Sequence, residues 1–266
     1  MIATNSVAPR TANVSAGTSA FLMAVLEKGL SQPYEEIDVV TTPMGAPVAM
    51  IHVNNFTVEL NAWAALFAEV LAMAGAQMPK GKLLDSLYDA SAKGDADCGG
   101  VVGYNFLAGE PIAGVATGAP LLMRAPDGSL TLGNFMKMQL YSAVGSLALG
   151  MKILEREQVG LDSVCGHGGF FKAGKVSQSV MSVAIGAPVT VMENAGEGGA
   201  WGVALLALMT AKGETDAAAF LDRLFAGAKR VTVAADAREQ RDFAAFLTNY
   251  QKGLAVERLA AKTVKN

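Results

Sequence analysis

The sequence predicts an α/β domain with a mixed β-sheet flanked by helices. Short apolar segments typical of strands come first, and helices then alternate with further strands, which is the order of elements in such domains. Apolar residues make up 52% of the 266 residues and charged residues only 17%, which is enough for a sizeable core. No repeat, low-complexity stretch or obvious linker divides the chain, so we expect one domain over 1–266.

The first part of the chain carries most of the strand signals. After a weakly patterned start over 1–11, apolar segments bounded by turn residues predict strands at 12–15, 20–26, 37–41 and 48–53. Gly17 is expected in the turn between the first two, because glycine adopts backbone geometry that other residues resist.

The rest of the chain reads mainly as helices. The segment 58–74 is the clearest, with Leu60, Trp63, Phe67 and Leu71 at helical spacing and no internal Gly or Pro. The same reasoning predicts helices at 82–92, 130–155, 175–184, 198–209, 215–225 and 236–264. Further strands are predicted at 101–106, 162–165 and 189–192.

Charge and composition exclude several classes of function. The net charge of −3 gives no electrostatic reason to expect nucleic acid or an anionic membrane as a partner. Two cysteines and two histidines exclude a disulfide framework and a multi-histidine metal centre, so Cys98 and Cys165 are expected to be buried thiols. No apolar run of about 18 residues predicts a membrane-spanning helix, and the start lacks a signal-peptide pattern. A cytoplasmic protein is therefore expected.

Two glycine-rich segments are the candidate ligand-binding features. A tight turn at Gly17-Thr18-Ser19 would expose amides and hydroxyls that can hold a phosphate, although an ordinary hairpin turn has the same residues. The segment 166–169 follows a strand and precedes a helix, where open α/β sheets bind ligands, or it is a plain connection. Neither segment is a Walker-type phosphate loop or a dinucleotide fingerprint.

Other residues near these segments have two interpretations each. The small residues at 197–202 could lie against an adenine ring or against a neighbouring helix. Lys172 and Lys175 could meet a phosphate or be solvated charges.

The order of several short motifs resembles one known family. The motifs are Gly17-Thr18-Ser19, then Gly109-Glu110, Gly168-Gly169 with Gln178, Gly186-Ala187-Pro188-Val189, and Glu197 with Ala200-Trp201-Gly202-Val203-Ala204. In this order they resemble the C-terminal domain of the FGGY carbohydrate kinases, with ribulokinase-like members nearest. The resemblance covers essentially the whole chain.

The resemblance implies a fold and a nucleotide site. The family has two actin-like, ribonuclease H-like domains with ATP and sugar in the cleft between them, and the second domain supplies most of the nucleotide site. Gly17 and Thr18 then match the phosphate-binding turn, with Ser19 beside them. Gly168 and Gly169 match a double glycine near the adenosine and α-phosphate. Ala173 stands where some members place Asn or Ser against adenine, and Asn54, Asn55 and Asn61 lie around a helix start that borders the nucleotide.

The resemblance also implies what this chain lacks. The family's N-terminal sugar-binding domain, with the first phosphate turn, is absent, and the catalytic aspartate is expected just before Met1, since the first aspartate here is Asp38. The expected function is therefore the ATP- and Mg²⁺-binding half of a sugar kinase, with a pentulose-like sugar held mainly by the missing domain. Alone, the chain is expected to be inactive. A homodimer is compatible with the sequence.

Three alternatives stay open. The chain could sense nucleotide without chemistry, or it could be an oligomerisation module that binds no nucleotide. A different actin-like ATPase, such as an acetate kinase relative, is disfavoured by the pattern from Gln178 to Val203.

Overall fold

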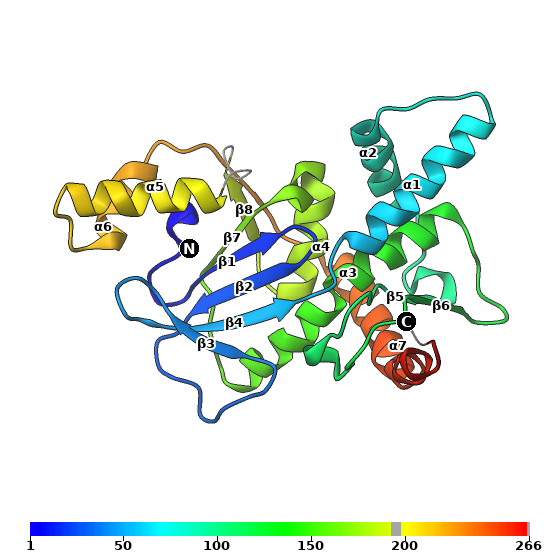
Figure 1. The fold of residues 1–266 in the computed structure, drawn as a ribbon, viewed down its shortest axis with the longest axis horizontal. Helices are drawn as coiled ribbons and strands as arrows, with labels where there is room; N and C mark the ends of the chain where they lie inside the picture. The colour runs from blue at the N-terminus through cyan, green and yellow to red at the C-terminus, as the bar shows by residue number, and fades with distance from the viewer. Residues whose placement is uncertain (193–197, 265–266) are drawn as a thin grey trace. The chain divides into compact units, whose positions relative to one another are not determined.

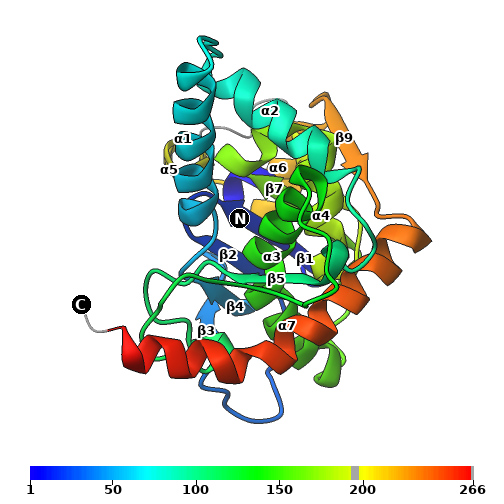
Figure 2. The same cartoon turned by 90° about the vertical axis from the view of Figure 1, so that its right-hand side faces the viewer.

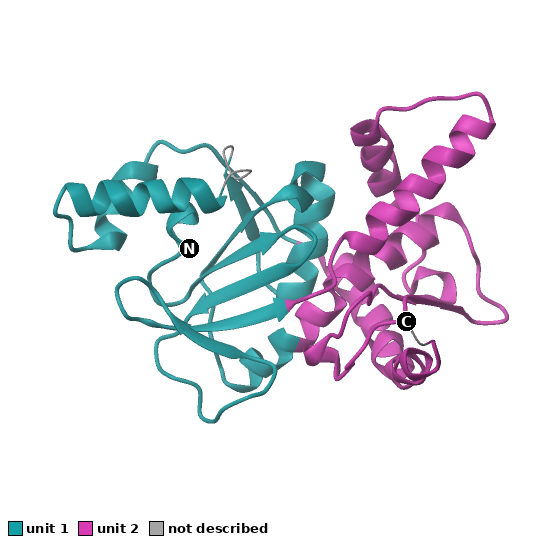
Figure 3. Cartoon of the chain, in the orientation of Figure 1, with its two compact units in different colours: residues 1–52, 150–234 teal, residues 53–149, 235–266 magenta. Residues whose placement is uncertain are grey.

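A computed structural model describes residues 1–192 and 198–264 of the chain. The chain divides into two compact units (Figure 3). The first consists of Met1–His52 and Gly150–Ala234, and the second of Val53–Leu149 and Ala235–Asn266. A single domain over 1–266 stays a prediction.

The first unit is built on a seven-stranded mixed sheet (Figure 1). Its strand order is β3-β4-β2-β1-β7-β8-β9. The strands are β1 (Thr11–Ala16), β2 (Ala20–Val25), β3 (Asp38–Thr41), β4 (Pro47–Val53), β7 (Ser163–His167), β8 (Val189–Met192) and β9 (Arg230–Val233). Central β1 pairs antiparallel with β2 and parallel with β7, and β7 pairs parallel with β8. The predicted mixed α/β sheet is thereby confirmed.

Helices and one buried N-terminal turn complete the first unit. They are η1 (Ile2–Thr4), η4 (Gly169–Ala173), α4 (Lys175–Ile185), α5 (Gly198–Ala211), α6 (Ala217–Phe225) and the end of α3 (Leu132–Arg156), which starts in the second unit. The weakly patterned start is more ordered than its sequence suggests. Ile2 and Val7 are buried in one apolar cluster with Met209, Phe220 and Phe225, because α5 and α6 offer them a shared apolar surface.

The second unit is mainly helical (Figure 2). It contains α1 (Val58–Met73), α2 (Lys80–Ser91), η2 (Cys98–Gly100), η3 (Pro111–Ala113), the start of α3, α7 (Ala237–Thr263) and a two-stranded sheet of β5 (Val101–Tyr104) and β6 (Leu121–Arg124). The predicted strand 101–106 ends at Tyr104. In α7, Phe246 and Tyr250 are fully buried, and the backbone carbonyl of Tyr250 accepts a hydrogen bond from the Tyr104 hydroxyl at 2.5 Å. None of the described helices is long and apolar enough to cross a membrane.

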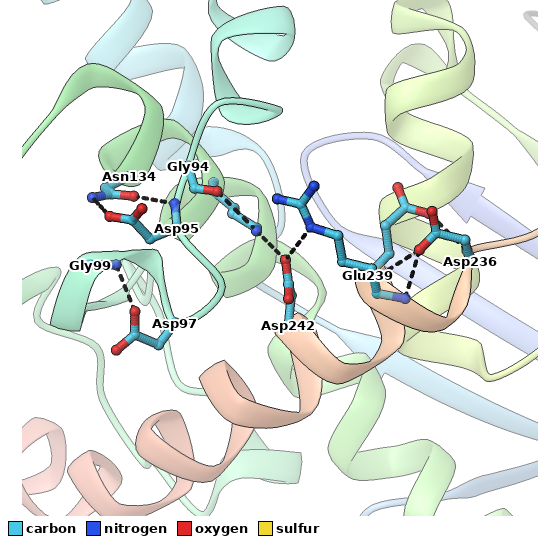
Figure 4. Close-up of polar contacts among 10 residues, drawn as sticks. Gly94, Asp95, Asp97, Gly99, Asn134, Asp236, Glu239 and Asp242 are labelled. Atoms are coloured by element: carbon cyan, nitrogen blue, oxygen red, sulfur yellow. Dashed lines mark hydrogen bonds and ion pairs between the residues drawn. The ribbon is translucent and has the colours of Figure 1, made fainter.

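A buried ion pair connects α3 and α7 within the second unit (Figure 4). Lys137 Nζ lies 2.7 Å from Asp242 Oδ2, with 11% and 9% of the two side chains exposed, and it also donates to the Gly94 carbonyl at 3.3 Å. Beside it, Asn134 Nδ2 donates to Asp95 Oδ2 at 2.8 Å and Asn134 Oδ1 accepts from the Asp95 amide at 2.6 Å. The loop before η2 is therefore fixed to α3 by side-chain hydrogen bonds.

We expect Asp242→Asn to lower the free energy of unfolding by about 3 kcal/mol, because it leaves the Lys137 ammonium buried without its counter-charge. The double variant Lys137→Met, Asp242→Leu should lose much less, since neither charge remains to be buried. Urea titration followed by circular dichroism measures both. A double variant no more stable than Asp242→Asn would contradict the assignment of the cost to the unpaired charge.

Candidate functional site

The first candidate segment forms the turn between β1 and β2. The Gly17 amide donates to the Ser19 carbonyl at 2.9 Å, and Gly17 and Thr18 are exposed. Within the described part of the chain, no partner is found for the hydroxyls of Thr18 and Ser19. The prediction that this turn needs the special backbone of Gly17 is wrong. Gly17 has no positive φ, and a Cβ there would meet only the Ser19 carbonyl oxygen at 3.9 Å.

The second candidate segment begins later than the sequence suggests. Gly166 and His167 belong to β7 rather than to the turn, because β7 continues to pair with β1 and β8 there. The turn starts at Gly168, whose φ of 107° favours glycine, and a Cβ on Gly168 would overlap the Ala16 carbonyl oxygen. Gly169 opens η4, is exposed, and has open space where a Cβ would be.

Parallel pairing brings the two segments together. Ser15 of β1 is in register with His167 of β7, so both strands end at the same edge of the sheet. The backbone of Gly168 is packed against Ala16, directly before the Gly17-Thr18-Ser19 turn. Two glycine-containing turns thus lie side by side beyond the carboxyl ends of adjacent parallel strands, which is a favoured ligand position in α/β sheets.

The residues that follow Gly169 differ in what they can offer a ligand. Ala173 ends η4 and is half-buried, while Lys172 and Lys175 are exposed. Gln178 is buried and has a structural role. Its side-chain amide nitrogen Nε2 donates hydrogen bonds to the carbonyls of Val189 at 3.0 Å and Val231 at 2.9 Å. It fixes α4 to β8 and β9.

A cavity of about 400 Å³ opens at the ends of β7 and β8. His167, Met192, Trp201 and Lys229 are among its lining residues. His167 contacts Asn13 through Nε2 at 3.2 Å, and burial lowers the pKa of its imidazole. Glu197, which belongs to the small-residue segment predicted above, lies outside the described residues.

The three asparagines are in the second unit, and their amides are engaged there. Asn55 Oδ1 accepts hydrogen bonds from the Leu107 and Ala108 amides at 2.9 Å each. Asn54 Nδ2 donates to the Gly109 carbonyl at 2.9 Å, and Asn61 Nδ2 donates to the Thr57 carbonyl at 2.9 Å. These side chains organise the chain before and at the start of α1.

Glu110 is the centre of this hydrogen-bond network. Its side chain is fully buried and accepts from the amide of Asn55 at 3.1 Å, from Asn55 Nδ2 at 3.1 Å and from the amide of Asn54 at 3.4 Å. Burial raises the pKa of Glu110, and these donors act against that rise. Glu110 stands out in the sequence only as part of the Gly109-Glu110 motif, and nothing local predicts this structural role.

The two cysteines and the acidic residues form no metal centre within the described chain. Cys98 is buried, which raises the pKa of its thiol, whereas Cys165 is half-buried rather than buried as expected. Across residues 1–192 and 198–264, no group of three or more His, Cys, Asp or Glu side chains could hold a metal ion.

We expect Glu110→Ala to lower the free energy of unfolding by about 3 kcal/mol, because it leaves the buried amide of Asn55 and the half-buried amide of Asn54 without their acceptor. Chemical denaturation measures the loss. Glu69→Ala, an exposed carboxylate on α1, is the matched control and should change stability by less than about 0.5 kcal/mol. Equal effects of the two substitutions would show that the Glu110 network is not stabilising.

The neighbouring glycines should respond differently to one methyl group. Gly168→Ala places a Cβ against the Ala16 carbonyl at a positive φ, so we expect a loss of at least about 2 kcal/mol. Gly169→Ala meets open space and should leave stability within about 0.5 kcal/mol. Thermal unfolding of both variants measures the difference, and a Gly169→Ala variant as unstable as Gly168→Ala would refute the described turn.

Comparison with known proteins identifies the family. Residues 12–211 match the model of the FGGY family of carbohydrate kinases, C-terminal domain. No curated protein matches the chain.

Solved structures share the fold at low sequence identity. Xylulose kinase from Rhodospirillum rubrum aligns at 14% identity and a TM-score of 0.72, over 96% of this chain and 49% of that chain. Gluconate kinase from Lactobacillus acidophilus aligns at 15% identity and a TM-score of 0.76, over 99% of this chain and 51% of that chain. Glycerol kinase from Plasmodium falciparum with ADP aligns at 14% identity and a TM-score of 0.65, over 97% of this chain and 48% of that chain.

The chain thus spans about half the length of the solved kinases that it matches. These likenesses extend over both units and confirm the predicted actin-like ATPase fold. Because the family model covers most of the sequence, the chain belongs to the FGGY family of carbohydrate kinases and carries that family's C-terminal domain.

Proposed function

We propose that this chain is the ATP-binding half of a carbohydrate kinase, which transfers the γ-phosphoryl group of ATP to a sugar hydroxyl. The observation that carries the proposal is the meeting of the Gly17-Thr18-Ser19 turn and the Gly168-Gly169 turn beyond β1 and β7. Membership of the FGGY family supports it. The similar glycerol kinase was solved with ADP.

The chemistry of the two turns suits a polyphosphate. Backbone amides and the hydroxyls of Thr18 and Ser19 are donors for phosphate oxygens, and Gly169 presents no side chain to a ligand. Lys172 and Lys175 add positive charge at the surface nearby. In the proposal, Gly168 and Gly169 approach the adenosine and α-phosphate, and Ala173 lies against the base.

Magnesium fits this residue set poorly as a protein-bound ion. The residues of the two turns, 17–19 and 168–173, include no carboxylate, and Mg²⁺ prefers carboxylate oxygens, phosphate oxygens and water. We therefore infer that any Mg²⁺ arrives on the phosphates of ATP. The chain's own contribution is to bind and orient the nucleotide, since positioning and electrostatic stabilisation dominate phosphoryl transfer.

The general base is proposed to come from outside this chain. A sugar hydroxyl must lose its proton during transfer, and neither turn contains a residue that could accept it. We propose that an N-terminal sugar-binding domain supplies the catalytic aspartate, the first phosphate turn and most sugar contacts. Similarity to xylulose kinases supports a pentulose-like sugar as the substrate. The proposed use of ATP by this chain supports a cytoplasmic location.

An exposed apolar surface on α5 supports the need for such a partner. Trp201, Val203 and Leu208 are 43%, 68% and 40% exposed, and α5 contains no charged residue. A helix that is apolar on all sides is normally covered in a soluble protein. The same surface supports the second candidate, an oligomerisation module, which would bind no nucleotide.

The test is calorimetric titration with Mg-ADP of the wild-type chain and two variants. The wild type and Gly169→Ala should bind alike, because the alanine meets open space. Gly169→Asp should bind at least about 30-fold more weakly, since it places a negative charge beside the phosphates. No saturable binding by the wild type, or equal binding by Gly169→Asp, would contradict the proposed site.

A turnover assay tests the division of labour. With ATP and a panel of pentuloses, the purified chain should release ADP no faster than a protein-free control, because the proposed base lies outside the chain. Turnover that remains proportional to the concentration of the chain through successive purification steps would contradict the proposal.

A further inference from the structure

A small pocket in the second unit lies apart from both glycine turns. It has a volume of about 50 Å³ and is lined by the start of α1, one residue of α3 and the β5–β6 sheet. Its lining residues include Glu59, Trp63, Tyr104, Leu121, Leu122 and Gln139. All of them belong to the second unit, so the pocket is formed within one compact body.

Gln139 is the buried polar group of this pocket. Only 6% of the residue is exposed, and within the described part of the chain its amide makes no hydrogen bond. The amide nitrogen and oxygen are not among the fully buried unpaired atoms of the described chain, so solvent reaches them. An amide with no protein partner at the wall of a pocket is free to bond a ligand there.

Glu59 is the charged group of the pocket. It is half-buried and accepts a hydrogen bond from the Trp63 indole, and burial raises its pKa. Among the described residues no Lys or Arg forms an ion pair with it, and no cationic side chain lines the pocket. Its negative charge is therefore uncompensated in a partly desolvated place, which favours a cation.

The remaining walls are aromatic and apolar. The Tyr104 hydroxyl already donates to the Tyr250 carbonyl at 2.5 Å, so Tyr104 offers the pocket its ring. Leu121 and Leu122 complete the wall from β6. The polar groups that face a ligand thus reduce to one carboxylate and one amide beside an indole ring.

We propose that this pocket binds the primary ammonium group of a small molecule. An ammonium group has three donors and no acceptor, which matches the Glu59 carboxylate and the Gln139 carbonyl oxygen. The ring of Trp63 adds an aromatic surface that attracts cations. A volume of about 50 Å³ admits the head group and one or two carbons, which Leu121 and Leu122 would contact.

The chain offers a direct readout of this binding. It has two tryptophans, Trp63 in the pocket and Trp201 on α5 in the other unit, so a ¹⁵N-labelled sample gives two indole resonances. The sample is titrated at pH 7.5 with ethylammonium chloride. Ethanol, a neutral molecule of similar size, and sodium chloride at the same ionic strength are the matched controls.

We expect ethylammonium alone to shift the Trp63 resonance in a saturable way and to leave Trp201 unchanged. Glu59→Gln should weaken the binding at least about tenfold, since a hydrogen bond to a charged group is lost. Gln139→Leu, which keeps the volume, should weaken it several-fold. Glu69→Gln, an exposed carboxylate on the same helix, should bind like the wild type.

Several results would overturn the proposal. They are the absence of a saturable Trp63 shift, an equal shift with sodium chloride or ethanol, and undiminished binding by both pocket variants. The Trp201 resonance and the circular dichroism spectrum report whether each variant is folded. If Glu59→Gln does not fold, Gln139→Leu and the ethanol titration still decide the question.

Discussion

The parallel pairing of β1 with β7 is the constraint on which the candidate nucleotide site depends. The two strands are distant in the sequence, and the whole second unit except its C-terminal helix lies between them in the chain. Their register places the Gly17-Thr18-Ser19 turn next to Gly168, whose backbone is packed on Ala16 too closely for any side chain. The need for glycine is therefore steric at Gly168, whereas at Gly169 a Cβ would meet open space.

The second unit depends on polar interactions that are buried. Glu110 accepts three hydrogen bonds from the asparagines before α1, and the Lys137–Asp242 pair joins α3 to α7. Such networks add little net stability when complete but cost several kcal/mol when one member is lost. They explain why residues that resemble ligand contacts in the sequence, Asn55 above all, serve the fold through their side chains.

Much of the fold could be predicted from the sequence, because apolar periodicity and turn residues are local signals. The long helices and the central strands follow from them. The edge strand β9 and the short β6 could not be predicted, since exposed residues such as Arg230 and Thr232 carry no burial pattern. The end of β7 was also hidden, because the glycine at Gly166 is typical of a turn and only pairing with β1 and β8 shows it to be strand.

The site shows the same division between local and long-range information. Both glycine segments could be located in the sequence, but their contact depends on strand register, and the roles of Lys172, Lys175 and Ala173 stay predictions. The pocket at Glu59 and Gln139 could not be predicted, because it joins residues from α1, α3 and the β5–β6 sheet. Hydrogen–deuterium exchange with and without Mg-ADP tests the central claim most directly. The account predicts protection confined to 16–20 and 166–174, with 26–36 unchanged, whereas no protection in either glycine segment would contradict it.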